Sequence, residues 1–132
     1  MRRLIPLVCL LVTTLVVSRE GLEALPQQTA ALRVVSAAPN GDTASLTQAS
    51  EIRVIFSEPM VALGRVPAQP DVPWATIAPA VKGAWRWSGT TVLIFTPDPS
   101  TPLPFATRYT VTIGTGATSA AGQKLAQPYR FD

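Results

Sequence analysis

The sequence predicts an all-β fold, a sandwich of about seven short strands. Two observations predict it. Runs in which apolar and polar residues alternate recur from Leu32 to Asp132, and this two-residue period is typical of half-buried strands. Clusters rich in proline, glycine, asparagine and aspartate separate the runs and favour turns. We therefore expect one β domain, since 132 residues are enough for one domain but not comfortably for two.

The first three strands are bounded by prolines. The first, at 32–37, ends at the strong turn sequence 39–42, Pro-Asn-Gly-Asp. The second, at 51–56, alternates apolar and polar residues and stops before Pro59, because proline cannot donate to a sheet ladder. A proline-rich stretch, 66–73, then leads to a short third strand at 74–77.

The remaining strands are separated by glycine turns. We expect a hairpin of strands 83–87 and 91–95 across Ser88-Gly89-Thr90, with Trp85 and Trp87 on one face. The strongest alternation follows at 108–113 and ends at glycines. The closing strand is expected near 129–131.

Seven short strands at this spacing are typical of an immunoglobulin-like β-sandwich. The segment from Leu103-Pro104 to Tyr109 fits the tyrosine corner of such folds, in which a tyrosine hydroxyl bonds back to the preceding loop. The alternative is that Tyr109 is simply the first core residue of its strand.

Residues 1–18 are expected to form a signal peptide. Arg2 and Arg3 precede an apolar run of about 14 residues, which is too short to span a membrane but suits a signal h-region. Cleavage after Ser18 would leave a flexible lead-in, 19–31, before the sandwich domain, 32–132. The chain is thus expected to be exported to the periplasm, the cell surface or the medium. An uncleaved anchor is the alternative, and contact with a membrane is expected only through this leader.

Composition removes several classes of function. The only cysteine, Cys9, falls within the leader, so the mature chain is expected to lack disulfides, thiolate metal sites and cysteine nucleophiles. Without Arg2 and Arg3 the net charge falls from +3 to +1, and no basic cluster remains to suggest nucleic-acid binding. There is no histidine, which removes the commonest general base and metal ligand.

Other polar motifs are weak. Ser57 and Glu58 are adjacent and point to opposite faces of a strand, so they do not form a catalytic pair. Asn40, Asp42 and Glu58 could act as calcium ligands if one end of the sandwich gathers them, but ordinary turn chemistry is the favoured explanation. We predict no catalytic residue, no metal and no cofactor.

The chain resembles the bacterial Ig-like domains of the SbsA type over roughly 32–132. The shared pattern is a proline turn, a strand ending in FSEPM, a strand before a proline, a leucine-proline-tyrosine segment, a glycine turn and a closing phenylalanine. These elements are Pro39, 56–60, 93–97, 103–109, Gly122 and Phe131. The structural residues that follow from this reading are Phe56, Pro59, Met60, Phe95, Tyr109 and Phe131.

A narrower resemblance, carried by 60–64, 77–79 and 82–90, is to an early domain of bacterial α2-macroglobulin-like protease traps. The thioester of those proteins needs a cysteine, and none is expected in the mature chain. The resemblance therefore implies a leading module or a fragment of such a protein, and not a working inhibitor.

Two functions are consistent with these observations. The first is a non-catalytic structural or protein-contact module outside the cytoplasm, whose partners are the other domains of a larger protein or a surface protein. The alternative is a freestanding adhesion module that binds a polysaccharide or cell-wall component through an interaction surface of Trp85 and Trp87, since exposed tryptophans stack on sugars or grip a partner. The alternative explanation of this pair is purely structural: both tryptophans fill the core.

Overall fold

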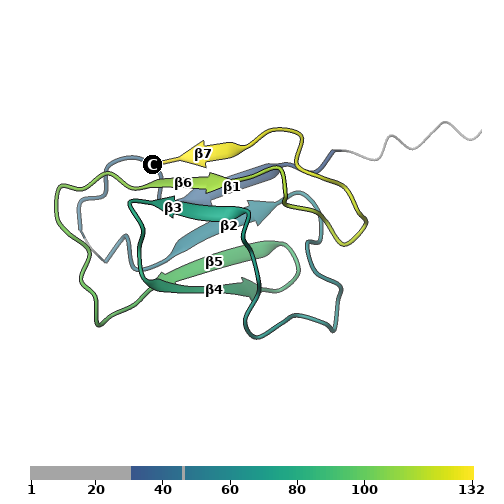
Figure 1. Ribbon diagram of the computed structural model, residues 1–132, viewed down its shortest axis with the longest axis horizontal. Coiled ribbons are helices and arrows are strands. Elements are labelled where there is room, and N and C mark those ends of the chain that lie inside the picture. Colours follow the sequence, from purple (N-terminus) through teal and green to yellow (C-terminus); the bar gives the residue numbers. More distant parts are fainter. Residues whose placement is uncertain (1–30, 46) are drawn as a thin grey trace, which may run out of the picture.

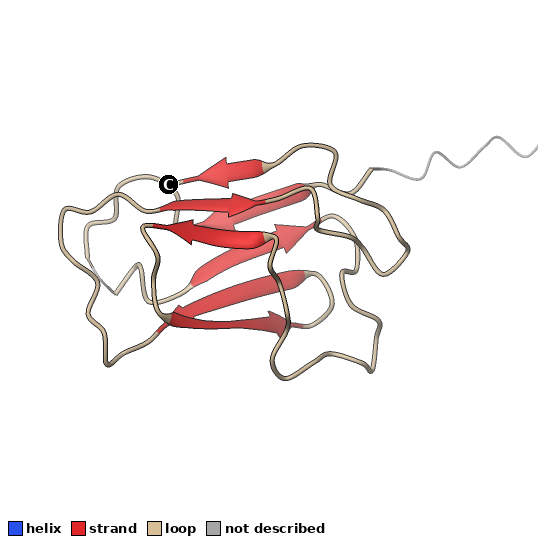
Figure 2. Cartoon of the chain, viewed as in Figure 1, coloured by secondary structure: helices blue, strands red, loops and turns tan. Residues whose placement is uncertain are grey.

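The computed structural model describes residues 31–45 and 47–132, and shows a two-layered β-sandwich (Figure 1). Figure 2 shows strands and loops and no helix in these ranges, hence no helix long and apolar enough to cross a membrane. Every predicted strand is present, with boundaries within two residues of the expected ones. The strands are β1 (Val34–Ala38), β2 (Ile52–Phe56), β3 (Ala75–Ala78), β4 (Gly83–Ser88), β5 (Val92–Pro97), β6 (Thr110–Ile113) and β7 (Tyr129–Phe131).

The strands form two antiparallel sheets. The first sheet has the order β1-β2-β5-β4 and the second has the order β3-β6-β7. These are the strand orders of a constant-type immunoglobulin domain, ABED on CFG. The predicted immunoglobulin-like fold is confirmed. The predicted leader, 1–18, and nearly all of the lead-in, 19–31, lie outside the described residues.

The core follows the alternation of the strands. In β2, Val54 and Phe56 are buried whereas Arg53 and Ile55 face solvent. In β6, Val111 and Ile113 are buried in the same way. Side chains of both sheets meet between the layers and form one apolar cluster. Its buried members are Leu32, Val54, Phe56, Met60, Val72, Ala75, Trp87, Leu93, Val111, Ile113, Ala117, Leu125 and Phe131.

Three aromatic rings fill one end of the sandwich. The ring of Phe56 lies 6.0 Å from Trp74 and 6.1 Å from Trp87, and the two indoles are 6.4 Å apart. A hydrogen bond fixes Trp74 beside the second sheet: the Gly114 amide, just after β6, donates to the Trp74 carbonyl at 2.7 Å. This aromatic trio packs the inter-sheet space with a few large side chains.

The 57–60 turn, the SEPM of the sequence, lies at the same end and binds three other segments. The Ser57 hydroxyl accepts from the Arg33 amide at 3.1 Å. The Met60 amide donates to the Thr90 carbonyl at 2.7 Å, and the Pro59 carbonyl accepts from the Ala120 amide at 2.8 Å. Thr90 belongs to the β4–β5 turn of the first sheet and Ala120 to the β6–β7 connection of the second. The turn therefore cross-links both sheets through its backbone.

Met60→Ala is expected to lower the free energy of unfolding by about 2–5 kcal/mol, because Met60 is 7% exposed and its loss leaves a cavity beneath the turn. Leu63→Ala, only a few residues along but 91% exposed, is expected to change it by less than about 0.5 kcal/mol. Urea denaturation followed by tryptophan fluorescence measures both. Similar losses in the two variants would contradict this role for Met60.

Gly83→Ala is expected to destabilise the fold by about 1–3 kcal/mol. A Cβ at Gly83 would meet the Phe95 ring and the Thr96 carbonyl more closely than side chains tolerate, and the carbonyl belongs to a paired strand that cannot move aside. Ala84→Ser, on the outer face of the same strand, is the control and is expected to change stability little. Thermal unfolding by circular dichroism compares them, and equal melting temperatures would be the contrary result.

Candidate interaction site

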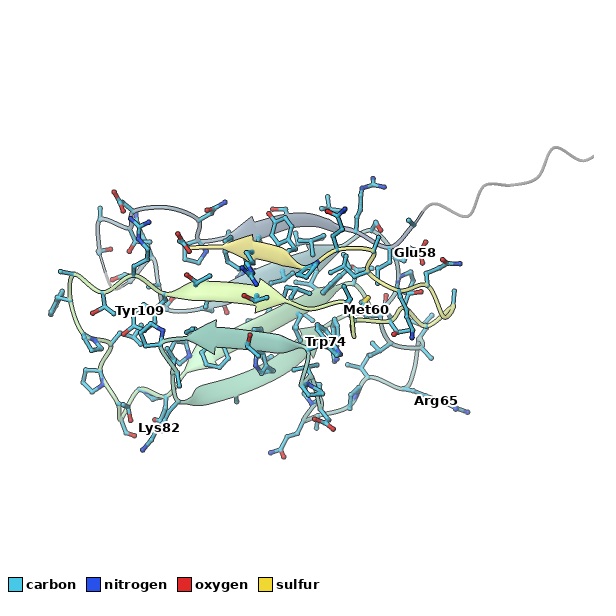
Figure 3. All side chains as sticks on the ribbon, turned by 45° about the horizontal axis from the view of Figure 1, so that its top comes forward. Glu58, Met60, Arg65, Trp74, Lys82 and Tyr109 are labelled. Carbon is cyan, nitrogen blue, oxygen red and sulfur yellow. The ribbon has the colours of Figure 1, made fainter. Side chains whose placement is uncertain are left out.

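A hollow lies between the sheets at the end opposite the 57–60 turn. Its volume is about 860 Å³, and it opens to solvent between the β1–β2 and β5–β6 loops. Figure 3 shows Tyr109 at this end and Met60 at the other. We call this feature the end hollow. Its apolar lining comes from both sheets and two loops: Ile52, Ile77, Val81, Phe95, Leu103, Val111 and Phe131.

One large aromatic side chain of the end hollow, that of Phe95, packs sideways along its own sheet. Phe95 stacks on Trp85 with ring centroids 4.9 Å apart, and its ring covers Gly83 on the same neighbouring strand. The ring thus lies along the first sheet toward β4. Ile52 and Ile77, which face each other's sheets at this end, are too small to replace the aromatic trio of the opposite end.

Polar groups hold the rim of the end hollow. The Asp132 carboxylate accepts from the Thr110 hydroxyl at 2.8 Å and from Arg108 Nη1 at 3.5 Å. The Asp132 carbonyl accepts from the Gly41 amide at 2.7 Å. These bonds fix the β1–β2 loop to the second sheet. Asp42 also lines the rim and makes no ion pair with any residue in the described ranges.

The β5–β6 loop begins with an ordered carboxylate. Asp98 Oδ1 accepts from the Ser100 hydroxyl at 2.8 Å and from the Ser100 amide at 2.9 Å. These two bonds, helped by the nearby positive charge of Lys82, lower the pKa of Asp98 below its ordinary value. The loop continues past Phe105, which is 80% exposed beside the mouth of the hollow.

The opposite end carries an apolar projection. The 62–66 turn is closed by a hydrogen bond from the Arg65 amide to the Ala62 carbonyl at 3.0 Å. Leu63 at its tip is 91% exposed and Val66 is also exposed. Figure 3 places Arg65 far from Tyr109, at the other end of the sandwich.

The structure places the predicted interaction pair on the inner face. Trp87 is 9% exposed and belongs to the core, and Trp85 is half-buried against Phe95. The arrangement favours the core explanation of the pair. Among the residues expected to be structural, Phe56, Met60, Phe95 and Phe131 are buried, Pro59 is exposed, and Tyr109 is half-buried in the wall of the end hollow.

The structure bears on two interpretations of polar residues, the expected tyrosine corner and the disfavoured calcium site. No hydrogen bond joins the Tyr109 hydroxyl to the preceding loop in the described chain, so the bond expected of a tyrosine corner is missing. Asn40 and Asp42 lie at the end hollow, whereas Glu58 lies at the opposite end, because the length of β2 separates them. Over residues 31–45 and 47–132 no three metal-ligating side chains lie close enough to hold an ion.

Sequence reasoning missed the end hollow and the projection. The bonds of Asp132 to Thr110 and Gly41 join segments far apart in the chain and leave no local pattern. The exposure of Leu63 could have been predicted from the sequence. Leu63 precedes Gly64 in a segment without a strand pattern, and this context is typical of a turn.

Comparison with family models matches residues 28–132 to the model described as a bacterial Ig-like domain. The match includes all seven strands and the end hollow. Comparison with curated proteins and comparison with solved structures both give no match.

We expect Asp98 to titrate below the usual range of aspartates, and Ser100→Ala to raise its pKa toward that range by removing the hydroxyl donor. A depressed pKa in the folded state adds stability above about pH 4 that is lost as the pH falls through the folded value. Carboxyl chemical shifts followed by NMR against pH measure this, with Asp71, also exposed, as the internal comparison. Identical titrations of Asp98 with and without the Ser100 hydroxyl would contradict the assignment.

Proposed function

The chain belongs to the bacterial Ig-like domain family, and from this we propose that it is a non-catalytic structural and protein-contact module that acts outside the cytoplasm. The observation that carries the proposal is the family match across the whole sandwich, 28–132, together with the constant-type strand order. Ig-like domains commonly sit within larger proteins and mediate interactions, so this step of the proposal is an argument by family analogy.

The polar residues of the described sandwich support a module without catalysis. The Ser57 hydroxyl accepts from the Arg33 amide, and so serves the fold. The carboxylates of Glu51, Asp98 and Asp132 are each bound to neighbouring arginines or hydroxyls. These groups act as structural acceptors at separate places on the molecule.

Export is the second part of the proposal. The leader supplies its support, because a basic start followed by a short apolar run is the pattern of a secretory signal. The residues 31–45 and 47–132 contain no cysteine, and this does not count against export.

The finer assignment is to a leading module of an α2-macroglobulin-like protein. It rests on the segments 60–64, 77–79 and 82–90, which in the structure form the start of the apolar projection, the end of β3 and the β4–β5 hairpin. The first segment lies at the end that carries the 57–60 turn, the second lies at the opposite end, and the third runs along β4 from one end to the other. The thioester of those proteins has no counterpart in the described residues.

A freestanding adhesion module is the weaker alternative. It requires sugars to stack on Trp85 and Trp87, and the burial of Trp87 removes one of the two platforms. A glycan-binding screen with Trp85→Ala and Trp87→Ala, each checked for folding by circular dichroism, tests this alternative, and glycan binding that is unchanged in both variants would exclude adhesion through the pair.

Intact-mass measurement of the exported protein is expected to show an N-terminus at Arg19. Leu10→Arg, which places a charge in the apolar run, is expected to retain the full-length chain in the cytoplasm. Gln27→Arg adds the same charge outside that run and is expected to be exported normally. Cytoplasmic retention of the unmodified protein would overturn export.

A further inference from the structure

The Asn40-Gly41 step of the β1–β2 loop combines the two groups that react in asparagine deamidation. Asn40 is the only asparagine of the sequence, and both residues are exposed to solvent. We propose that Asn40 is a site of spontaneous deamidation whose rate is controlled by the fold, through the hydrogen bond from the Gly41 amide to the Asp132 carbonyl. The modification needs only water and is independent of the proposed function.

The reaction is a cyclisation followed by hydrolysis. The Gly41 backbone nitrogen loses its proton to hydroxide and attacks Cγ of Asn40, so that a new N–Cγ bond forms. The Cγ–Nδ2 bond breaks, and Nδ2 takes a proton from water and leaves as ammonia. A water molecule then opens the resulting cyclic imide at either of its carbonyls and yields aspartate or isoaspartate. Water is consumed and ammonia is released, with no oxidant or reductant.

The local structure favours this attack. Asparagine is a thermolabile side chain, and Gly41 offers its nitrogen without the steric obstacle of a Cβ. Gly41 has a positive φ of 84°, and no atom of another segment lies within 4 Å of the position that a Cβ would take. The Asn40 side chain makes no hydrogen bond among the residues that the structure describes, so its amide can turn toward the Gly41 nitrogen.

The fold restrains the attacking nitrogen. The Gly41 amide donates to the Asp132 carbonyl at 2.7 Å, and a nitrogen in that bond keeps both its proton and its orientation. Asp132 is fixed in turn, because its carboxylate accepts from the Thr110 hydroxyl at 2.8 Å and from Arg108 Nη1 at 3.5 Å. Deamidation therefore requires the loop to open from β7, and its rate follows the population of the open loop.

This opening is a local event. The other backbone bonds of the loop in the described residues run within the loop itself, from Gln48 to Ser45 and from Ser50 to Thr47. The Gly41–Asp132 bond is the backbone bond that ties the described part of the loop to the second sheet. Its loss leaves the ladders of both sheets intact, and exposed loop bonds of this kind open at the low end of the stability scale.

The products change the rim of the end hollow. Aspartate at position 40 adds a negative charge to a rim that already carries carboxylates and arginines. Isoaspartate also inserts a methylene into the backbone before Gly41, so the Gly41 amide can no longer meet the Asp132 carbonyl in the same turn. The bond that restrained the reaction is then not remade, and the loop stays apart from β7.

Incubation of the exported chain in mildly alkaline buffer tests the site. Mass spectrometry of the tryptic peptide 34–53 follows conversion of Asn40 to the acid, and an isoaspartyl methyltransferase measures isoaspartate. Conversion is expected to accelerate as the pH rises, because the attacking nitrogen must lose its proton. Asn40→Gln is expected to abolish the isoaspartate signal. A chain unfolded in guanidinium chloride is expected to convert faster than the folded chain.

Two matched variants test the control by the fold. Thr110→Val removes the hydroxyl that fixes Asp132 and is expected to raise the rate about fivefold, the factor for one ordinary hydrogen bond. Thr112→Val makes the same change on the same face of β6, where the hydroxyl has no bond in the described residues, and is expected to leave the rate unchanged. Circular dichroism checks that both variants fold.

Each contrary result is specific. A folded chain that shows no acid form at residue 40 after the unfolded chain has converted overturns the site. Equal rates in the folded and unfolded chains, or in the two threonine variants, overturn the control by the fold. None of these outcomes bears on export or on contact with other domains.

Discussion

The fold depends on the backbone cross-link made by the 57–60 turn. Antibody-type domains join their sheets by a disulfide between the second and sixth strands, and the described part of this chain has no cysteine to form one. Here Pro59 and Met60 bond to connections that belong to different sheets, directly beside the aromatic trio. Proline suits this position because its fixed φ ends the strand while its carbonyl remains free to accept. The FSEPM sequence therefore combines a buried Phe56 and Met60 with two structural acceptors.

Because only one end of the sandwich is closely packed, the two ends of the domain differ in structure. The side chains of Phe56, Trp74 and Trp87 fill the space between the sheets at the cross-linked end. At the other end Phe95 packs along its own sheet on Trp85, and the space between the layers is left to smaller residues and loops. The hydrogen bonds of Asp132 keep that end together without filling it. The described sandwich therefore has one closely packed end and one hollow end.

All seven strands were predictable from sequence because alternation and turn residues are local signals. The same signals place Trp85 and Trp87 on one face but do not say how deeply that face is buried, which depends on what the other sheet contributes. The end hollow was not predictable, since it results from the direction of the Phe95 ring and from bonds such as that of Thr110 to Asp132. The separation of Glu58 from Asp42 follows from the strand between them. Both stand next to β2 in sequence, and a strand carries its two flanking turns to opposite ends.

The outer face of the first sheet is less available for contact than its strand pattern suggests. Ile94 points outward from β5, yet it is 4% exposed, because it pairs with Arg53 on one side and Arg86 on the other. Glu51 binds both guanidinium groups, which holds their aliphatic stems over Ile94. An ion pair this exposed adds little stability, so its main effect is to cover apolar surface. The most exposed large apolar side chains, Leu63 and Phe105, instead stand on connections at the two ends. The exposed apolar surface of the described sandwich is therefore concentrated on loop tips at its two ends, and the outer face of the first sheet is covered at its centre.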